Sequence, residues 1–135
     1  MKYFDCHADT LTQVIKEGES LEKNTCDIDL QRIEKFADTY TQIFAIWKNR
    51  KEILPGTESS VFRKSYEKAM ELLQKAENKI RLCTSAKEME DAHQNGKAAA
   101  FLSVEDVSIM GEDIERIREL GILFVLLSWN YENEY

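Results

Sequence analysis

The chain has 135 residues, enough for one domain with a hydrophobic core, and its 43% apolar and 32% charged residues are typical of a globular protein. The formal net charge of -7 argues against a nucleic acid or an anionic membrane surface as the main partner. No apolar run approaches the ~18 residues of a membrane span, and no cleavable apolar stretch precedes the first core residues. Because the three cysteines are widely spaced and odd in number, we expect reduced thiols and a cytoplasmic protein.

The first half of the chain alternates between strand-like and helix-like segments. In chain order, the sequence predicts a strand over residues 3–6, a helix over 10–17, a loop over 18–26, a short helix from Asp27 to Phe36, a strand over 39–47 and a loop over 50–57. Gly18 ends the first helix, because glycine favours the left-handed conformation found there. The segment TYTQIFAIW is rich in β-branched and aromatic residues and predicts the second strand.

The second half continues this alternation. In chain order, the sequence predicts a helix over residues 62–78, a short strand or extended connection over 80–83, a helix from Ser85 to Gly96, a strand over 98–104, an amphipathic helix over 112–120 and a strand over 122–128. Ser85 and Glu88 have the spacing of a capping box. The last two strands are continuous apolar runs, so we expect both to be buried on both faces.

This β-α-β-α order indicates an α/β fold in which helices cover a parallel sheet of about four strands. A closed (β/α)8 TIM barrel needs eight strands and typically ~250 residues. The chain therefore fits either the N-terminal half of such a barrel or a small open α/β sheet, and periodicity alone does not separate the two. Half a barrel would leave two unpaired strand edges, which favour self-association and a homo-oligomer.

Polar residues follow the first predicted strand at its C-terminal end, where parallel α/β folds place their working residues. His7 and Asp9 lie two residues apart, so on extended backbone their side chains point the same way. An imidazole nitrogen and a carboxylate oxygen directed at one point suit Zn²⁺ or a similar divalent ion. The alternative is a hydrogen-bonded pair in which Asp9 caps the following helix.

Glu105 directly follows the apolar run of the third principal strand. An unpaired carboxylate is unfavourable in such a place, so Glu105 requires a cation or several hydrogen-bond donors. A carboxylate that bridges two metal ions is one interpretation, and a solvated residue or an N-terminal partner of the helix over 112–120 is the other. The remaining histidine, His93, is expected to lie on a helix face in a structural role. We predict that His7, Asp9 and Glu105 form part of a metal site.

Four segments resemble the membrane (renal) dipeptidase family. The segment FDCHADTL over residues 4–11 is similar to the family's opening motif, D-x-H-x-D-T. The segment QIFAIW over 42–47 resembles its second strand, and GKAAAFLSVE over 96–105 resembles its third. Leu120-Gly121, followed by LLSWN over 126–130, is similar to its fourth. Since the order and spacing agree along nearly the whole chain, the resemblance covers residues 1–135 as the N-terminal portion of an amidohydrolase-like bacterial member.

The resemblance implies a (β/α)8 barrel of which residues 1–135 form an incomplete, N-terminal half. It implies two Zn²⁺ ions, with His7 and Asp9 as ligands of one ion, Glu105 as the bridge, and further ligands from later strands. The implied reaction is hydrolysis of the peptide bond of a dipeptide through a metal-bridging hydroxide, with this chain carrying only part of the site. No catalytic residue is assigned within the chain, and Trp129 and Asn130 are expected to contact the substrate.

The chain departs from the family pattern at two strand ends. The family often has Glu-Gly-Gly after the third strand, where this chain has Glu105-Asp106-Val107. It often has a histidine at the fourth strand end, where this chain has Trp129, whose indole N–H can still donate a hydrogen bond. Two alternatives stay open: another two-metal amidohydrolase that acts on a different amide or a lactone, and a non-catalytic fragment that self-associates.

Overall fold

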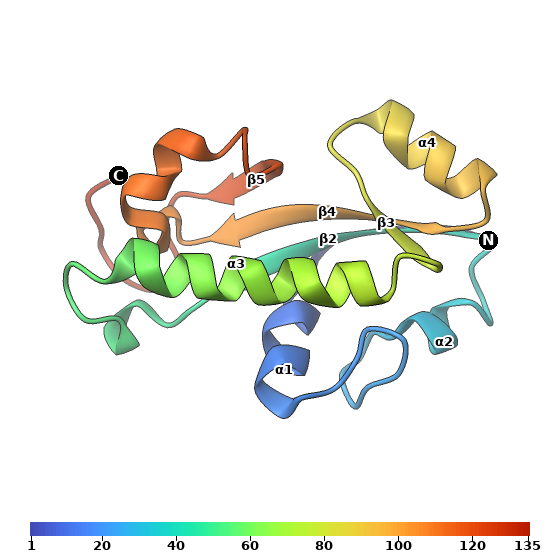
Figure 1. The fold of residues 1–135 in the computed structure, drawn as a ribbon, viewed down its shortest axis with the longest axis horizontal. Helices are drawn as coiled ribbons and strands as arrows, with labels where there is room; N and C mark the ends of the chain where they lie inside the picture. The colour runs from blue at the N-terminus through green and yellow to red at the C-terminus, as the bar shows by residue number, and fades with distance from the viewer.

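One parallel sheet of five strands organises the computed structural model, which describes residues 1–135 (Figure 1). The strands are β1 (Lys2–Ala8), β2 (Thr39–Trp47), β3 (Ile80–Leu82), β4 (Ala98–Glu105) and β5 (Ile122–Leu126). Strand β2 lies between β1 and β4, and both β3 and β5 pair with the other edge of β4. All pairings are parallel, so the C-terminal ends of the strands share one edge of the sheet. The predicted α/β fold is confirmed, with a fifth, short strand.

Helices occupy both faces of this sheet. They are α1 (Thr10–Glu17), α2 (Leu30–Ile33), α3 (Glu58–Lys75) and α4 (Ala86–Gln94), with 3-10 helices η1 (Arg50–Glu52) and η2 (Val107–Arg116). Ser85 Oγ accepts a hydrogen bond from the Glu88 amide at 3.2 Å, as the capping pattern predicts. The Glu88 carboxylate accepts in turn from the Thr84 amide at 2.6 Å. None of the helices is long and apolar enough to cross a membrane.

The core has two parts because successive strand residues point to opposite faces. Side chains such as Phe44 and Leu102 pack with α1 and α3 in the larger cluster, which has 20 buried residues. Ile43 and Phe101 point the other way and pack with Ala92 of α4. Figure 1 shows α1 and α4 on opposite sides of the sheet. Each strand therefore has a fixed face, which determines where the side chains at its C-terminal end project.

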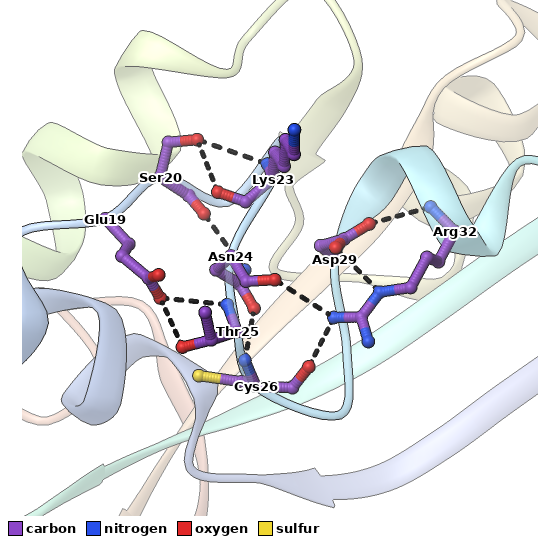
Figure 2. Close-up of polar contacts among 8 residues, drawn as sticks. All are labelled: Glu19, Ser20, Lys23, Asn24, Thr25, Cys26, Asp29 and Arg32. Atoms are coloured by element: carbon purple, nitrogen blue, oxygen red, sulfur yellow. Dashed lines mark hydrogen bonds and ion pairs between the residues drawn. The ribbon is translucent and has the colours of Figure 1, made fainter.

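The predicted loop after α1 is held by its own polar contacts (Figure 2). Glu19 Oε2 accepts from the amide and the hydroxyl of Thr25 at 3.0 and 3.1 Å. Asp29, not Asp27 as predicted, caps α2, and it accepts from the Arg32 amide and Nε, each at 2.7 Å. These contacts all lie between residues 19 and 32, so the segment that joins α1 to α2 is ordered by its own side chains.

The amphipathic helix predicted over 112–120 is found only in part, and it is not an α-helix. The structure has instead the 3-10 helix η2, interrupted by Gly111 with φ 53° and ψ -131°. This backbone conformation lies outside the helical region, so no continuous α-helix crosses it. The segment follows contacts with α3: Ser59 Oγ donates to the Met110 carbonyl at 2.9 Å, and Arg63 Nε lies 2.7 Å from the buried Asp113 carboxylate. Ile114, Ile117 and Leu120 nevertheless pack against the core, so the amphipathic pattern predicted the correct face but not the type of helix.

The burial predicted for the last strand is also wrong in this chain. Ile122 is buried, but the next four residues of β5 are exposed by 38–46%. Strand β5 pairs only with β4, so its other edge and much of its apolar surface have no neighbouring strand. The apolar run therefore predicted a strand correctly, but not its exposure.

Candidate metal site

The candidate metal ligands lie at the C-terminal ends of β1 and β4. His7 is the penultimate residue of β1, Asp9 follows that strand, and Glu105 is the last residue of β4. Strand β2 separates these two strands in the sheet. In (β/α)8 barrels, one layer of inward-pointing side chains comes from alternate strands. His7 and Glu105 likewise come from alternate strands, β1 and β4, with β2 between them.

An irregularity in β1 helps to present His7. The register of β1 and β2 runs from Asp5 opposite Gln42 to Ala8 opposite Phe44, so β1 contains one extra residue. Such a β-bulge bends a strand and redirects its side chains. Asp5 Oδ1 accepts a hydrogen bond from the His7 amide at 3.0 Å within this irregular stretch. The sequence analysis did not single out Asp5 as a residue that orients His7. Its side chain accepts from the amide of the residue two positions later, as in an Asx turn.

The three predicted ligands converge on one point. His7 Nε2 lies 3.3 Å from Glu105 Oε2 and 3.7 Å from Asp9 Oδ1. One ligand atom from each residue falls within 4.8 Å of the others. The side chains of His7 and Asp9 are 40% and 46% exposed and that of Glu105 is 12% exposed, so the cluster is open on the side of β1 and closed on the side of β4.

Burial dominates the electrostatics of Glu105. It raises the pKa of this carboxyl above the ordinary value, an effect that His7 opposes and the negative charge of Asp9 reinforces. A cation at this point would favour the ionised form. The site therefore concentrates negative charge where a divalent cation would neutralise it.

The residues present fit a divalent metal ion. One imidazole nitrogen and two carboxylates are a donor set that Zn²⁺ accepts. Asp9 is the N-cap residue of α1, but its side chain makes no capping hydrogen bond, so the capping alternative is not found. The polar contact of Glu105 is with His7, not with the segment over 112–120. That these residues bind metal stays a prediction.

The second histidine lies far from this cluster. His93 Nε2 is 3.1 Å from both the Tyr40 carbonyl oxygen and Thr41 Oγ1, near the N-terminal end of β2. It therefore ties α4 to the sheet at the end opposite the candidate site. A hollow of about 640 Å³ between α3 and β3 is lined by residues such as Tyr66 and Arg81 and likewise lies away from the cluster.

The two predicted substrate-contacting residues follow β5. The Trp129 ring packs edge-on against Trp47 at a centroid distance of 5.1 Å and against Tyr131 at 5.8 Å. Trp47 is the cross-strand partner of Glu105, so this group of aromatic rings begins one strand away from the cluster. Asn130 is exposed and makes no hydrogen bond in this chain. Substrate contact by Trp129 or Asn130 stays a prediction.

Comparison with known proteins shows the family of the chain. A sequence model of the family described as membrane dipeptidase, peptidase family M19, matches residues 1–135. Among curated protein sequences, none matches the chain.

Three solved structures have a similar fold. The metallopeptidase described as dipeptidase AC has a TM-score of 0.79 at 19% identity, covering 96% of this chain and 43% of its own. The probable dipeptidase PvdM from Pseudomonas aeruginosa has a TM-score of 0.77 at 16% identity, covering 100% of this chain and 36% of its own. A metallopeptidase from Rhodobacter sphaeroides, bound to a phosphinate mimic of L-Ala-D-Ala, has a TM-score of 0.72 at 16% identity, covering 98% and 46%.

The chain therefore spans less than half the length of each of these structures. At such identities the likeness shows the fold, and the prediction that the chain forms part of a (β/α)8 barrel is confirmed.

Proposed function

Because the chain belongs to the membrane dipeptidase family, peptidase family M19, we propose that the whole protein is a zinc-dependent dipeptidase. Residues 1–135 then form the N-terminal half of its barrel domain and carry part of its site. The observation that carries this proposal is the convergence of His7, Asp9 and Glu105 within 4.8 Å at two strand ends. Three groups of metal-binding chemistry, supplied by β1 and β4, meet where this fold class places its active sites.

Each of the three residues has a distinct role in the proposal. His7 would bind one ion through Nε2, the ring nitrogen that faces Glu105 and Asp9. Asp9 supplies a carboxylate to the same ion as His7. Glu105 would hold the same ion through its carboxylate and, together with ligands that lie outside these residues, a second ion.

The chemistry follows from these roles. When bound, two zinc ions lower the pKa of a shared water and polarise the scissile carbonyl, so that hydroxide is available near neutral pH. Glu105 keeps its charge in a partly buried place and thereby favours cation binding. Trp129 and Asn130 contact the dipeptide beside the cluster.

The dipeptide is proposed as substrate because of the family and the similar structures. Two of these are named as dipeptidases, and the third holds a mimic of a dipeptide. The alternative is another two-metal amidohydrolase that acts on a different amide or a lactone. Hydrolysis of a panel containing dipeptides, longer peptides, N-acyl amino acids and lactones separates the two.

Metal analysis together with dipeptide hydrolysis tests the proposal. The intact protein should bind about two zinc ions and cleave dipeptides, and Glu105→Gln should lose both properties. Glu115→Gln is the matched control, because it makes the same chemical change on an exposed part of η2. Unchanged activity and zinc content in Glu105→Gln would show that the assignment is wrong.

We also propose a cytoplasmic location and self-association. The location is supported by three free cysteines, of which Cys83 is buried and Cys6 is exposed. Self-association is proposed for residues 1–135 by themselves, and it is supported by the exposed apolar residues of β5, such as Leu123 and Phe124. Light scattering after size exclusion tests the latter, and a monomer with cooperative unfolding would contradict it.

A further inference from the structure

Asp106, the residue after Glu105, has an unusual backbone conformation. Its φ of 66° makes it the one non-glycine residue of the chain with a positive φ, and its ψ is 90°. Such a conformation is unfavourable for a non-glycine residue and persists only where the surroundings impose it. Asp106 is also only 1% exposed, and its Oδ2 is buried without a hydrogen-bond partner. Departures from local rules of this kind are typical of functional sites.

The other oxygen of Asp106 connects two strand ends. Oδ1 accepts hydrogen bonds from the Ser108 amide at 3.2 Å, from Ser108 Oγ at 2.6 Å and from Asn133 Nδ2 at 2.9 Å. The same Asn133 Nδ2 donates to the Leu127 carbonyl at 2.7 Å. Asn133 therefore joins the end of β4 to the end of β5. The Asx-turn pattern Asp106-Val-Ser108 is a sequence signal for the contact with Ser108, but not for the link to Asn133.

The segment between Leu127 and Asn133 carries two aromatic rings, which pack with a third ring from β2 next to the candidate metal site. We call Trp47, Trp129 and Tyr131 the aromatic wall, because Trp129 packs edge-on against both other rings. Lys51 Nζ lies 4.3 Å from the centre of the Tyr131 ring and holds the outer end of the wall. Since Trp47 is the cross-strand partner of Glu105, the wall lies beside the cluster. Trp129 is 36% exposed, which leaves apolar ring surface available to a ligand.

We propose that Asp106 is a positioning residue that acts through Asn133 to hold the aromatic wall beside the metal cluster, where the wall packs against an apolar side chain of the dipeptide. This inference rests on the dipeptidase function proposed above. A glycine at position 106 would adopt the observed backbone without strain. It would, however, remove the acceptor that fixes Asn133 and the one that caps η2 through Ser108, so the side chain of Asp106 serves both the turn and the position of the wall.

Steady-state kinetics with two dipeptides test this role in the intact protein. Asp106→Gly should raise KM for a phenylalanine-containing dipeptide by about tenfold, with kcat and the KM for dialanine changed less than about twofold. Asn133→Ala should have the same effect. Asp106→Asn should resemble the wild type, because its amide oxygen still accepts from Asn133 and asparagine tolerates positive φ. Equal KM changes for both dipeptides, or none, would overturn the proposal.

Thermal unfolding supplies a readout that does not depend on activity. If Asn133 acts with Asp106, the double variant Asp106→Gly/Asn133→Ala should lose less unfolding temperature than the sum of the two single variants, because only the bond of Asn133 to the Leu127 carbonyl remains to be lost once Asp106 is gone. Zinc content should be unchanged in all variants. Additive shifts would overturn the link. Should the wild type cleave no dipeptide, the dipeptidase proposal fails by itself, and this unfolding cycle still decides whether Asp106 holds Asn133.

Discussion

His7 Nε2 lies 3.3 Å from Glu105 Oε2, although β2 separates the strands that carry these two residues. Neighbouring strands are about 4.8 Å apart, so the backbones of β1 and β4 are roughly 10 Å apart. The two side chains close this gap over the end of β2. The contact brings a buried carboxylate to an imidazole nitrogen, and it couples the stability of the fold to the charge of the site.

Glu105→Gln should stabilise the metal-free protein at neutral pH. Burial raises the pKa of Glu105 in the folded state. The protonated carboxyl therefore favours the folded state at low pH, and this contribution to stability is lost as the pH rises through that pKa. Glutamine cannot ionise and avoids this loss. In the presence of chelator, the variant should therefore unfold at a higher temperature than the wild type at about pH 7, and the two should converge below about pH 4.

Added zinc should reverse that order, because an ion that binds only the folded state stabilises it. Wild-type protein should gain unfolding temperature with zinc, and Glu105→Gln should gain little. Equal stabilisation of both proteins by zinc would show that Glu105 does not contact the ion.

His7→Ala should weaken zinc binding by at least about 100-fold, since the loss of a ligand exceeds the 10–100-fold effect of an outer-shell partner. His7 is 40% exposed, so the stability of the metal-free protein should change by less than about 0.5 kcal/mol. Zinc titration with a competing chelator measures the affinity. A variant that binds zinc as tightly as the wild type would remove His7 from the site.

The candidate site was predictable as far as it depends on local pattern. Two local patterns were enough to select the three residues that the structure brings together. One is the pair His7 and Asp9, two residues apart at the end of a strand, and the other is the carboxylate of Glu105 at the end of an apolar run. The bulge that presents His7 depends on the pairing of β1 with β2, so no local pattern revealed it. The link from Asp106 to Asn133 joins two strand ends and was missed for the same reason.

The fold was predictable to a similar extent. The segment 39–47 was predicted with its observed bounds because its composition strongly favours a strand. In the segment 112–120 the amphipathic pattern predicted correctly that Ile114, Ile117 and Leu120 face the core, but it does not register the contacts with α3 that accompany the 3-10 geometry. The exposure of β5 depends on which strands lie beside it, which its own residues do not specify.

His93→Ala should lower stability without affecting zinc. Its Nε2 contacts the Tyr40 carbonyl and Thr41 Oγ1, each at 3.1 Å, and loss of these contacts should cost about 1–2 kcal/mol. As the only other histidine of these 135 residues, it is the matched control for His7→Ala. Chemical denaturation and zinc titration of both variants should give opposite patterns. A loss of zinc affinity in His93→Ala would contradict the structural role.

Gly111→Ala should be among the most destabilising single-methyl changes in the chain. Gly111 has φ 53°, and a Cβ there would lie 2.8 Å from Ser59 Oγ and 3.2 Å from the Ser59 amide nitrogen. Backbone strain and overpacking together should cost about 2–4 kcal/mol. Gly56→Ala is the matched control: its φ is also positive, at +80°, but a Cβ there would meet nothing within 4 Å. Strain alone should cost that variant about 1 kcal/mol. Chemical denaturation measures both, and equal losses would show that η2 moves away from α3 without a penalty.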